Sequence, residues 1–188
     1  MTMSVFGYSQ STESHHKVYI PFWIGAGYGY EWSVADEVTI NSQIDMRAYI
    51  GDDDFAIDNF VFSPRITIEP RYYYNLKKRA EKGKNINSNS ANYISFDLSY
   101  ELPLGLSGIR DVPQHTFRFL PSWGMRRELS EHFTMDFSVY AGYKLIGTQY
   151  YDDSDCYIDG GTTCDPWKTE FDNGKFVFGV NLIFSHIF

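Results

Sequence analysis

The sequence has no long hydrophobic run: no 18 consecutive residues are apolar, and the mean hydropathy is −0.35. Because a transmembrane helix needs about 20 consecutive apolar residues, helical membrane spans are excluded. Cysteine is scarce, with 2 residues in 188, too few for a disulfide-rich scaffold or a four-cysteine zinc site. Basic residues are outnumbered, 16 against 24 acidic ones, and the net charge of −8 excludes nucleic acid as an expected partner.

Aromatic residues, by contrast, are abundant. They make up 18% of the chain and include 15 Tyr and 15 Phe. Many aromatics with modest hydropathy are typical of an outer-membrane β-barrel, in which only every second residue of a strand faces lipid. We therefore expect a single barrel domain over residues 11–188, preceded by residues 1–10 as the remnant of a signal peptide or a flexible tail.

Seven segments alternate between apolar and polar or small residues with the period of two that defines a strand. They are residues 18–31, 38–50, 60–74, 93–102, 115–126, 133–147 and 175–188. The pattern predicts an all-β fold, an antiparallel up-and-down transmembrane β-barrel of about eight strands. Bacterial barrels have even strand numbers, so an eighth strand is expected. It is formed by residues before Lys17, or it lies elsewhere in the chain without a clear alternation, or the sequence is truncated.

Two local signals modify this pattern. Pro64 and Pro70 predict bulges or bends in the third segment, because each proline removes a ladder hydrogen bond. Residues 76–82 are predicted to form a short helical turn that ends at Gly83.

The chain ends on an aromatic residue, Phe188, and Phe184 shares its apolar face. This ending resembles the closing strand of bacterial outer-membrane barrels, which implies that barrel-assembly machinery recognises Phe184 and Phe188. We then expect Phe188 in the periplasm, and outer-membrane lipid and lipopolysaccharide around the wall. Short connections should be periplasmic and long ones extracellular, with residues 75–92 a long periplasmic exception. The expected extracellular loops are residues 51–58, 103–113 and 148–174.

The face expected to line the lumen carries six acidic and six basic residues. They are Glu31, Asp45, Glu69, Asp97, Glu101, Asp136, Arg47, Arg65, Arg71, Arg118, Arg126 and Lys144. An eight-stranded barrel is just wide enough for side chains to fill it, and buried charges must be paired. The balance of charges predicts an ion-paired, filled lumen without an open channel.

The expected loop over residues 148–174 is acidic and contains both cysteines. In an exported protein, Cys156 and Cys164 are expected to form a disulfide. The aspartates lack EF-hand spacing, since Tyr157 and Ile158 occupy a ligand and a glycine position, so a solvated loop is favoured over a calcium site. Neither a metal nor a cofactor is expected, and the outer loops are where an unidentified protein partner would bind.

Two smaller groups of side chains have competing interpretations. His15 and His16 are interpreted as a solvated pair in a tail rather than as a metal site. Tyr150 and Tyr151 fit an aromatic girdle at the membrane interface, and a sugar-stacking surface formed with Trp167 is the alternative.

Two other functions remain as alternatives. An outer-membrane lipid-modifying enzyme similar to the lipid A deacylases would need a Ser/His/acid cluster near the outer rim. His132-Phe-Thr134 has Thr in place of Ser and lies at a predicted periplasmic turn, and Ser185 and His186 point to opposite faces of one strand. A soluble lipocalin-like ligand-binding barrel would need an apolar interior and a Lys- and Glu-rich exterior, which the pattern does not favour.

Two stretches resemble a known group of proteins. They are EPRYYYNLKKRAEKGK (residues 69–84) with NSANY (residues 89–93), and PSWGMRR (residues 121–127) followed by His132 and Phe133. They are similar to small, uncharacterised outer-membrane proteins of Bacteroidota, and the likeness covers most of the chain from Val18 onward. The resemblance implies an outer-membrane barrel and implies no particular activity or functional residue.

Overall fold

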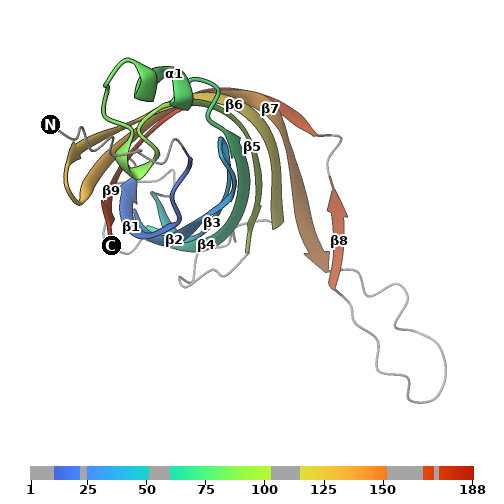
Figure 1. Cartoon of the computed structure of the whole chain (residues 1–188). Coiled ribbons are helices and arrows are strands. Elements are labelled where there is room, and N and C mark those ends of the chain that lie inside the picture. Colours follow the sequence, from blue (N-terminus) through green and yellow to red (C-terminus); the bar gives the residue numbers. More distant parts are fainter. Residues whose placement is uncertain (1–10, 22–24, 51–59, 103–114, 152–166, 172–173) are drawn as a thin grey trace, which may run out of the picture.

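The computed structural model is a closed antiparallel β-barrel, seen along its axis in Figure 1. It describes residues 11–21, 25–50, 60–102, 115–151, 167–171 and 174–188, without the side chains of 47–50, 60–62, 148–151 and 167–170. The strands are β1 (His15–Pro21), β2 (Gly25–Ala35), β3 (Val38–Ile50), β4 (Phe60–Tyr72), β5 (Asn92–Glu101), β6 (His115–Ser130), β7 (Phe133–Tyr151), β8 (Trp167–Phe171) and β9 (Lys175–Ile187). Two short helices, α1 (Leu76–Glu81) and the 3-10 helix η2 (Asn87–Asn89), lie between β4 and β5.

The wall consists of eight strands. Each strand from β1 to β7 pairs antiparallel with the next, and β9 closes the barrel by pairing with both β7 and β1. At this seam the backbones of His16 and Phe188 exchange hydrogen bonds of 3.2 and 3.1 Å. Strand β8 pairs with β7 beyond the β9 ladder and extends away from the barrel (Figure 1). The predicted all-β antiparallel barrel and its strand number are confirmed.

The eighth strand appears where a single strand over residues 18–31 was predicted, and that prediction is wrong. Two strands, β1 (His15–Pro21) and β2 (Gly25–Ala35), cover this region and pair so that Lys17 lies opposite Gly29 and Tyr19 opposite Gly27. Partners in this register are both odd or both even, so the alternation of inward and outward side chains keeps the same phase in β1 and β2. A pattern with a period of two therefore cannot distinguish this hairpin from one long strand.

Other boundaries shift less. The predicted loop over residues 148–174 is wrong at both ends, because β7 continues to Tyr151 and β8 occupies Trp167–Phe171. Aromatic residues and threonine in these two segments favour strands. Helix α1 agrees with the predicted helical turn, and Gly83, with a φ of 62°, follows it in the left-handed conformation that glycine readily adopts.

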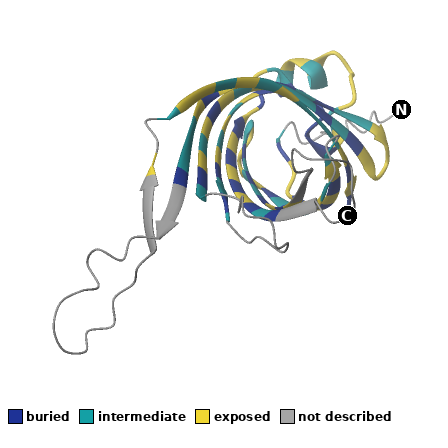
Figure 2. Cartoon of the chain, turned by 180° about the vertical axis from the view of Figure 1, so that it is seen from behind, coloured by how far each residue is buried: buried dark blue, intermediate teal, exposed yellow. Residues whose placement is uncertain are grey.

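Polar side chains line the inside of the barrel and apolar side chains cover the outside. Figure 2 shows buried and exposed residues alternating along the strands. Among the described residues, 27 large apolar side chains are exposed, whereas the buried residues other than glycine comprise seven apolar and 23 polar or charged ones. Apolar burial therefore contributes little inside the barrel, where buried polar groups must instead be stabilised by hydrogen bonds and ion pairs.

Candidate functional site

Glu31 and Arg126 form the centre of a buried ion-pair cluster in the lumen. Arg126 Nη1 lies 2.6 Å from Glu31 Oε2, and neither side chain has exposed surface. Strands β2 and β6, which carry them, are four strands apart around the eight-stranded wall. The contact therefore spans the lumen, which brings together residues 95 positions apart in the chain.

Arg126 also binds Asp136 on the neighbouring strand β7. Its Nε and Nη2 donate to the two oxygens of Asp136 at 3.0 and 2.9 Å, a bidentate arrangement. Arg71 of β4 lies 3.3 Å from the same carboxylate and 2.6 Å from Glu69. Three carboxylates and two guanidinium groups thus form one network in which every charge has an opposite partner, as burial requires.

Neutral groups complete the coordination of Glu31. The hydroxyls of Tyr73 and Thr39 donate to Glu31 Oε1 at 2.7 and 2.8 Å, and Asn89 Nδ2 donates to the same oxygen at 3.2 Å. A carboxylate with this many donors is held in one rotamer. The cluster is consequently a rigid crosslink between the wall and the segment that joins β4 to β5.

Two further ion pairs lie along the lumen. Arg65 Nη2 is 2.8 Å from Asp45 Oδ2, which also accepts a 3.0 Å hydrogen bond from the hydroxyl of Tyr19. Arg118 Nη2 is 2.6 Å from Glu101 Oε2. Both pairs join side chains of directly neighbouring strands, so they stabilise the wall locally rather than crosslink it.

Three residues predicted for the lumen network remain outside these pairs. Asp97 is half-buried near Arg65, and its Oδ1 has no hydrogen-bond partner in the described part of the chain. Lys144 faces the lumen and is half-buried. The side chain of Arg47 lies outside the described residues, although its backbone pairs with Gly25 and Ser63.

Sequence reasoning missed two basic residues of the main cluster. His15 is buried, with Nε2 3.5 Å from Glu31 Oε2, so its interpretation as a solvated tail residue is wrong. Lys17 is also buried, with Nζ 4.0 Å from the same oxygen. Both belong to β1, which begins three residues earlier than the predicted strand. Extending the odd-numbered alternation back from Tyr19 would have found them. His16, on the opposite face, stacks on Phe188.

The lumen is covered at one end by the chain between β4 and β5. Tyr73, Leu76, Ala91 and Tyr93 are buried together there, the single apolar cluster formed by buried residues in the described chain. Residues 11–14 reinforce this cover, since the backbone of Glu13 exchanges hydrogen bonds of 2.7 and 2.9 Å with the side chain of Asn89. We call these two segments, residues 11–14 and 73–91, the cap.

A cavity of about 30 Å³ lies inside the barrel between the main cluster and the Asp45–Arg65 pair, lined by Gln43, Glu69 and Asp97 among others. A space of this size holds roughly one water molecule. Side chains therefore fill the described lumen at this level.

The other predicted sites do not converge on a reactive group. The ring of His132 stacks on His186 outside the barrel, whereas Thr134 is buried inside, so the pair is not a dyad. Phe184 and Phe188 are exposed on the outer face. Cys156 and Cys164 lie outside the described residues, and their disulfide stays a prediction. Within the described ranges, no three His, Cys, Asp or Glu side chains are placed to hold a metal ion.

Comparison with known proteins adds no further assignment. No family model, curated protein or solved structure matches this chain. In the part of the chain that the structure describes, no helix is long and apolar enough to span a bilayer. The function is therefore inferred from the barrel itself.

Proposed function

We propose that this protein is an integral outer-membrane β-barrel with a structural or interaction role, whose filled lumen does not conduct. The carrying observation is the distribution of side chains: 27 large apolar side chains exposed on the described surface around an interior of paired charges. Exposed apolar surface on this scale is unfavourable in water and favourable in lipid. Phe178 illustrates it, with 82% of its surface exposed on β9.

The proposed topology follows from the positions of the chain ends. Both described ends lie on the capped side, where His16 and Phe188 are hydrogen-bonded. The tight turns after β2 and β6 lie on that side too. Short turns and both termini are periplasmic in bacterial barrels, which supports a periplasmic cap and extracellular β7 and β8 ends.

The two alternatives have less support. A lipocalin-like barrel binds its ligand in an apolar interior, whereas the centre of this lumen is the Glu31–Arg126 pair. A lipid A deacylase-like enzyme needs a hydroxyl activated by a histidine, and Thr134 and His132 lie on opposite sides of the wall. If the protein has an interaction role, its partner would bind at the extracellular side of the barrel, next to the ends of β7 and β8.

The experiment that tests membrane insertion is a heat-modifiability gel on membranes washed at high pH. The proposed barrel should stay with the membrane, and the unheated sample should migrate differently from the boiled one. A protein that washes off without a mobility shift would contradict the proposal. Cysteine alkylation before and after reduction, on the same samples, measures whether Cys156 and Cys164 are bonded.

A further inference from the structure

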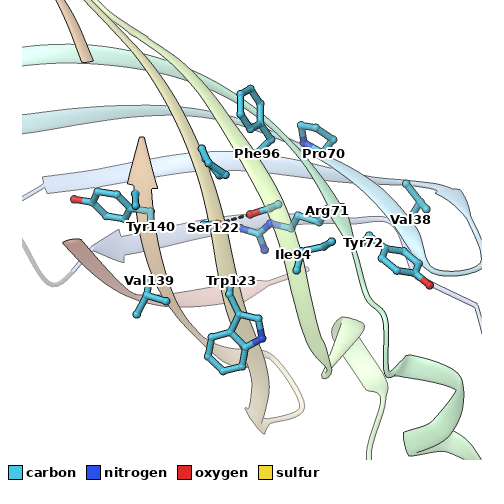
Figure 3. A pocket seen from close by; sticks show the side chains of 13 residues that line it. Val38, Pro70, Arg71, Tyr72, Ile94, Phe96, Ser122, Trp123, Val139 and Tyr140 are labelled. Carbon is cyan, nitrogen blue, oxygen red and sulfur yellow. Dashed lines mark hydrogen bonds between the residues drawn. The ribbon is translucent and has the colours of Figure 1, made fainter. Parts of the chain in front are cut away.

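The outer wall has a groove of about 790 Å³ across β3 to β7, on the half of the barrel nearer the cap (Figure 3). Its apolar lining includes Pro70, Tyr72, Phe96, Pro121 and Trp123. All five are on the outward face, so the groove opens away from the lumen. In a membrane-spanning barrel it would face the acyl chains of the bilayer.

Two prolines account for the position of the groove. The β4–β5 register passes from Ile68–Leu98 to Arg71–Ser95 without pairing Pro70. The β6–β7 register likewise omits Pro121. Proline has no N–H to donate, and a short ring replaces a long outward side chain at each position. The wall is therefore indented at the same depth on both sides of β5.

The indentation continues along the barrel axis. A second hollow of about 210 Å³ is lined by Ile68, Leu98 and Phe119, the next outward residues after Pro70, Phe96 and Pro121 on the same three strands. The two hollows follow one another along β4, β5 and β6. This elongated apolar shape suits a hydrocarbon chain.

Polar groups mark the capped end of the groove. Trp123 Nε1 donates to the hydroxyl of Tyr74 at 2.9 Å, and Asn92 Nδ2 approaches the same hydroxyl at 3.3 Å. Arg127 Nη2 donates to Asn92 Oδ1 at 2.6 Å. Arg127 and Trp123 share the outward face four residues apart, or about 14 Å along a strand. A ligand in the groove would meet an amphipathic ring first and a guanidinium group next.

Positive charge gathers at this end of an acidic protein. Residues 75–84 contain five basic residues and one acidic residue. Arg79, among them, lies near Arg127: its Nη2 donates to the carbonyl of Asn85 at 2.9 Å, and the side chain of Asn85 is hydrogen-bonded to Glu128, the residue that follows Arg127. Neither arginine forms an ion pair with a carboxylate of the described chain, in contrast to Arg71 and Arg126 inside the barrel. Two guanidinium groups at one end of the groove that form no direct ion pair retain N–H donors for a bound anion.

We propose that the groove binds an anionic glycerophospholipid, with one acyl chain along β4–β6 and its phosphate between Arg79 and Arg127. The inference rests on the proposed function, since the groove must face a bilayer. The occupant is a lipid because the site has three parts in sequence: a long apolar hollow, an amphipathic Trp–Tyr pair and a cationic end. These match the acyl chain, the glycerol ester region and the phosphate of one phospholipid. Basic residues at a membrane surface attract anionic lipid.

Quenching of a single tryptophan by brominated lipid tests the site. The W23F/W32F/W167F variant retains Trp123 in the groove, and the W23F/W123F/W167F variant retains Trp32, which is exposed on β2 and does not line the groove. Each is reconstituted in phosphatidylcholine vesicles containing a small fraction of acyl-brominated phosphatidylglycerol or acyl-brominated phosphatidylcholine. At Trp123 we expect phosphatidylglycerol to associate about fivefold more strongly than phosphatidylcholine. At Trp32 we expect the two lipids to associate equally.

Matched charge variants identify the residues responsible. Arg79→Gln with Arg127→Gln should remove the preference at Trp123. Lys82→Gln with Lys84→Gln removes the same charge from exposed residues of the same segment and should largely preserve the preference. Heat modifiability of each variant checks that it folds.

The outcomes separate the inference from the proposed function. If neither brominated lipid quenches either tryptophan, the protein is not inserted and the membrane proposal is wrong. If both lipids quench Trp123 equally, the barrel is inserted but the phospholipid site is wrong. Equal losses in the two charge variants would also overturn the site, because they would indicate diffuse attraction by the whole segment.

Discussion

The ring of Tyr93 lies over Gly124, its partner on the neighbouring strand, so closely that a Cβ at position 124 would be 2.4 Å from Tyr93 Cζ. The same relationship joins Tyr19 to Gly27. Tyrosine rings thus occupy the space that a side chain on the facing strand would need. The guanidinium carbon of Arg71 also lies over the Tyr93 ring, 4.5 Å from its centre. Glycine at these inward positions allows rings to fill a narrow lumen.

Gly124→Ala should destabilise the barrel by about 1–3 kcal/mol, because the added methyl group must displace the Tyr93 ring in a packed interior. The measurement is the urea midpoint of the folded fraction in detergent, followed on unheated gels. In a Tyr93→Leu background the same substitution should cost much less. Equal costs in both backgrounds would show that the ring contact is not responsible.

Arg126→Met should destabilise the protein by about 3–5 kcal/mol, since it leaves Glu31 and Asp136 buried without their main counter-charge. Arg127→Met is the matched control: the next residue, with the same substitution, is half-buried and has no carboxylate partner in the described chain. We expect the control to change stability by less than about 1 kcal/mol. Similar urea midpoints for the two variants would contradict a stabilising role for the cluster.

Closure of the barrel between β1 and β9 predicts a specific crosslink. Val18 and His186 are paired and both are exposed, so Val18→Cys with His186→Cys should form a disulfide when Cys156 and Cys164 are replaced by serine. Val18→Cys with Phe184→Cys, offset by two residues, should remain reduced. Non-reducing gels of folded protein distinguish the two. Crosslinking of the offset pair alone would indicate a different register at the seam.

The filled lumen predicts that the protein does not conduct ions. In planar bilayers the folded protein should give no discrete conductance steps, because side chains around Glu31 and Arg126 occupy the lumen and the cap covers one end. A porin with a water-filled lumen, measured under the same conditions, provides the positive control. Reproducible steps from the purified wild-type barrel would show that the network opens.

The local alternation of residues was sufficient to predict most strands and which side chains face inward. A strand places successive side chains on opposite faces, so Glu31, Glu69, Arg71, Arg126 and Asp136 could be assigned to one surface from their positions alone. The helical turn that precedes Gly83 was predictable for a similar reason, since its signals are a few residues apart.

Pairing across the lumen was decided by the tertiary structure. The alternation of residues predicts that Glu31 and Arg126 face inward. Strand order and register determine that these two charges meet and that Lys17 and His15 lie beside them. The hairpin of β1 and β2 was hidden because its register preserves the phase of the alternation. The outer groove depends on strand pairing too: Pro70 and Pro121 are 51 positions apart and form one indentation because β5 lies between their strands at the same depth. The sequence alone determined the two faces of the wall, and the closed barrel determined which residues meet on each.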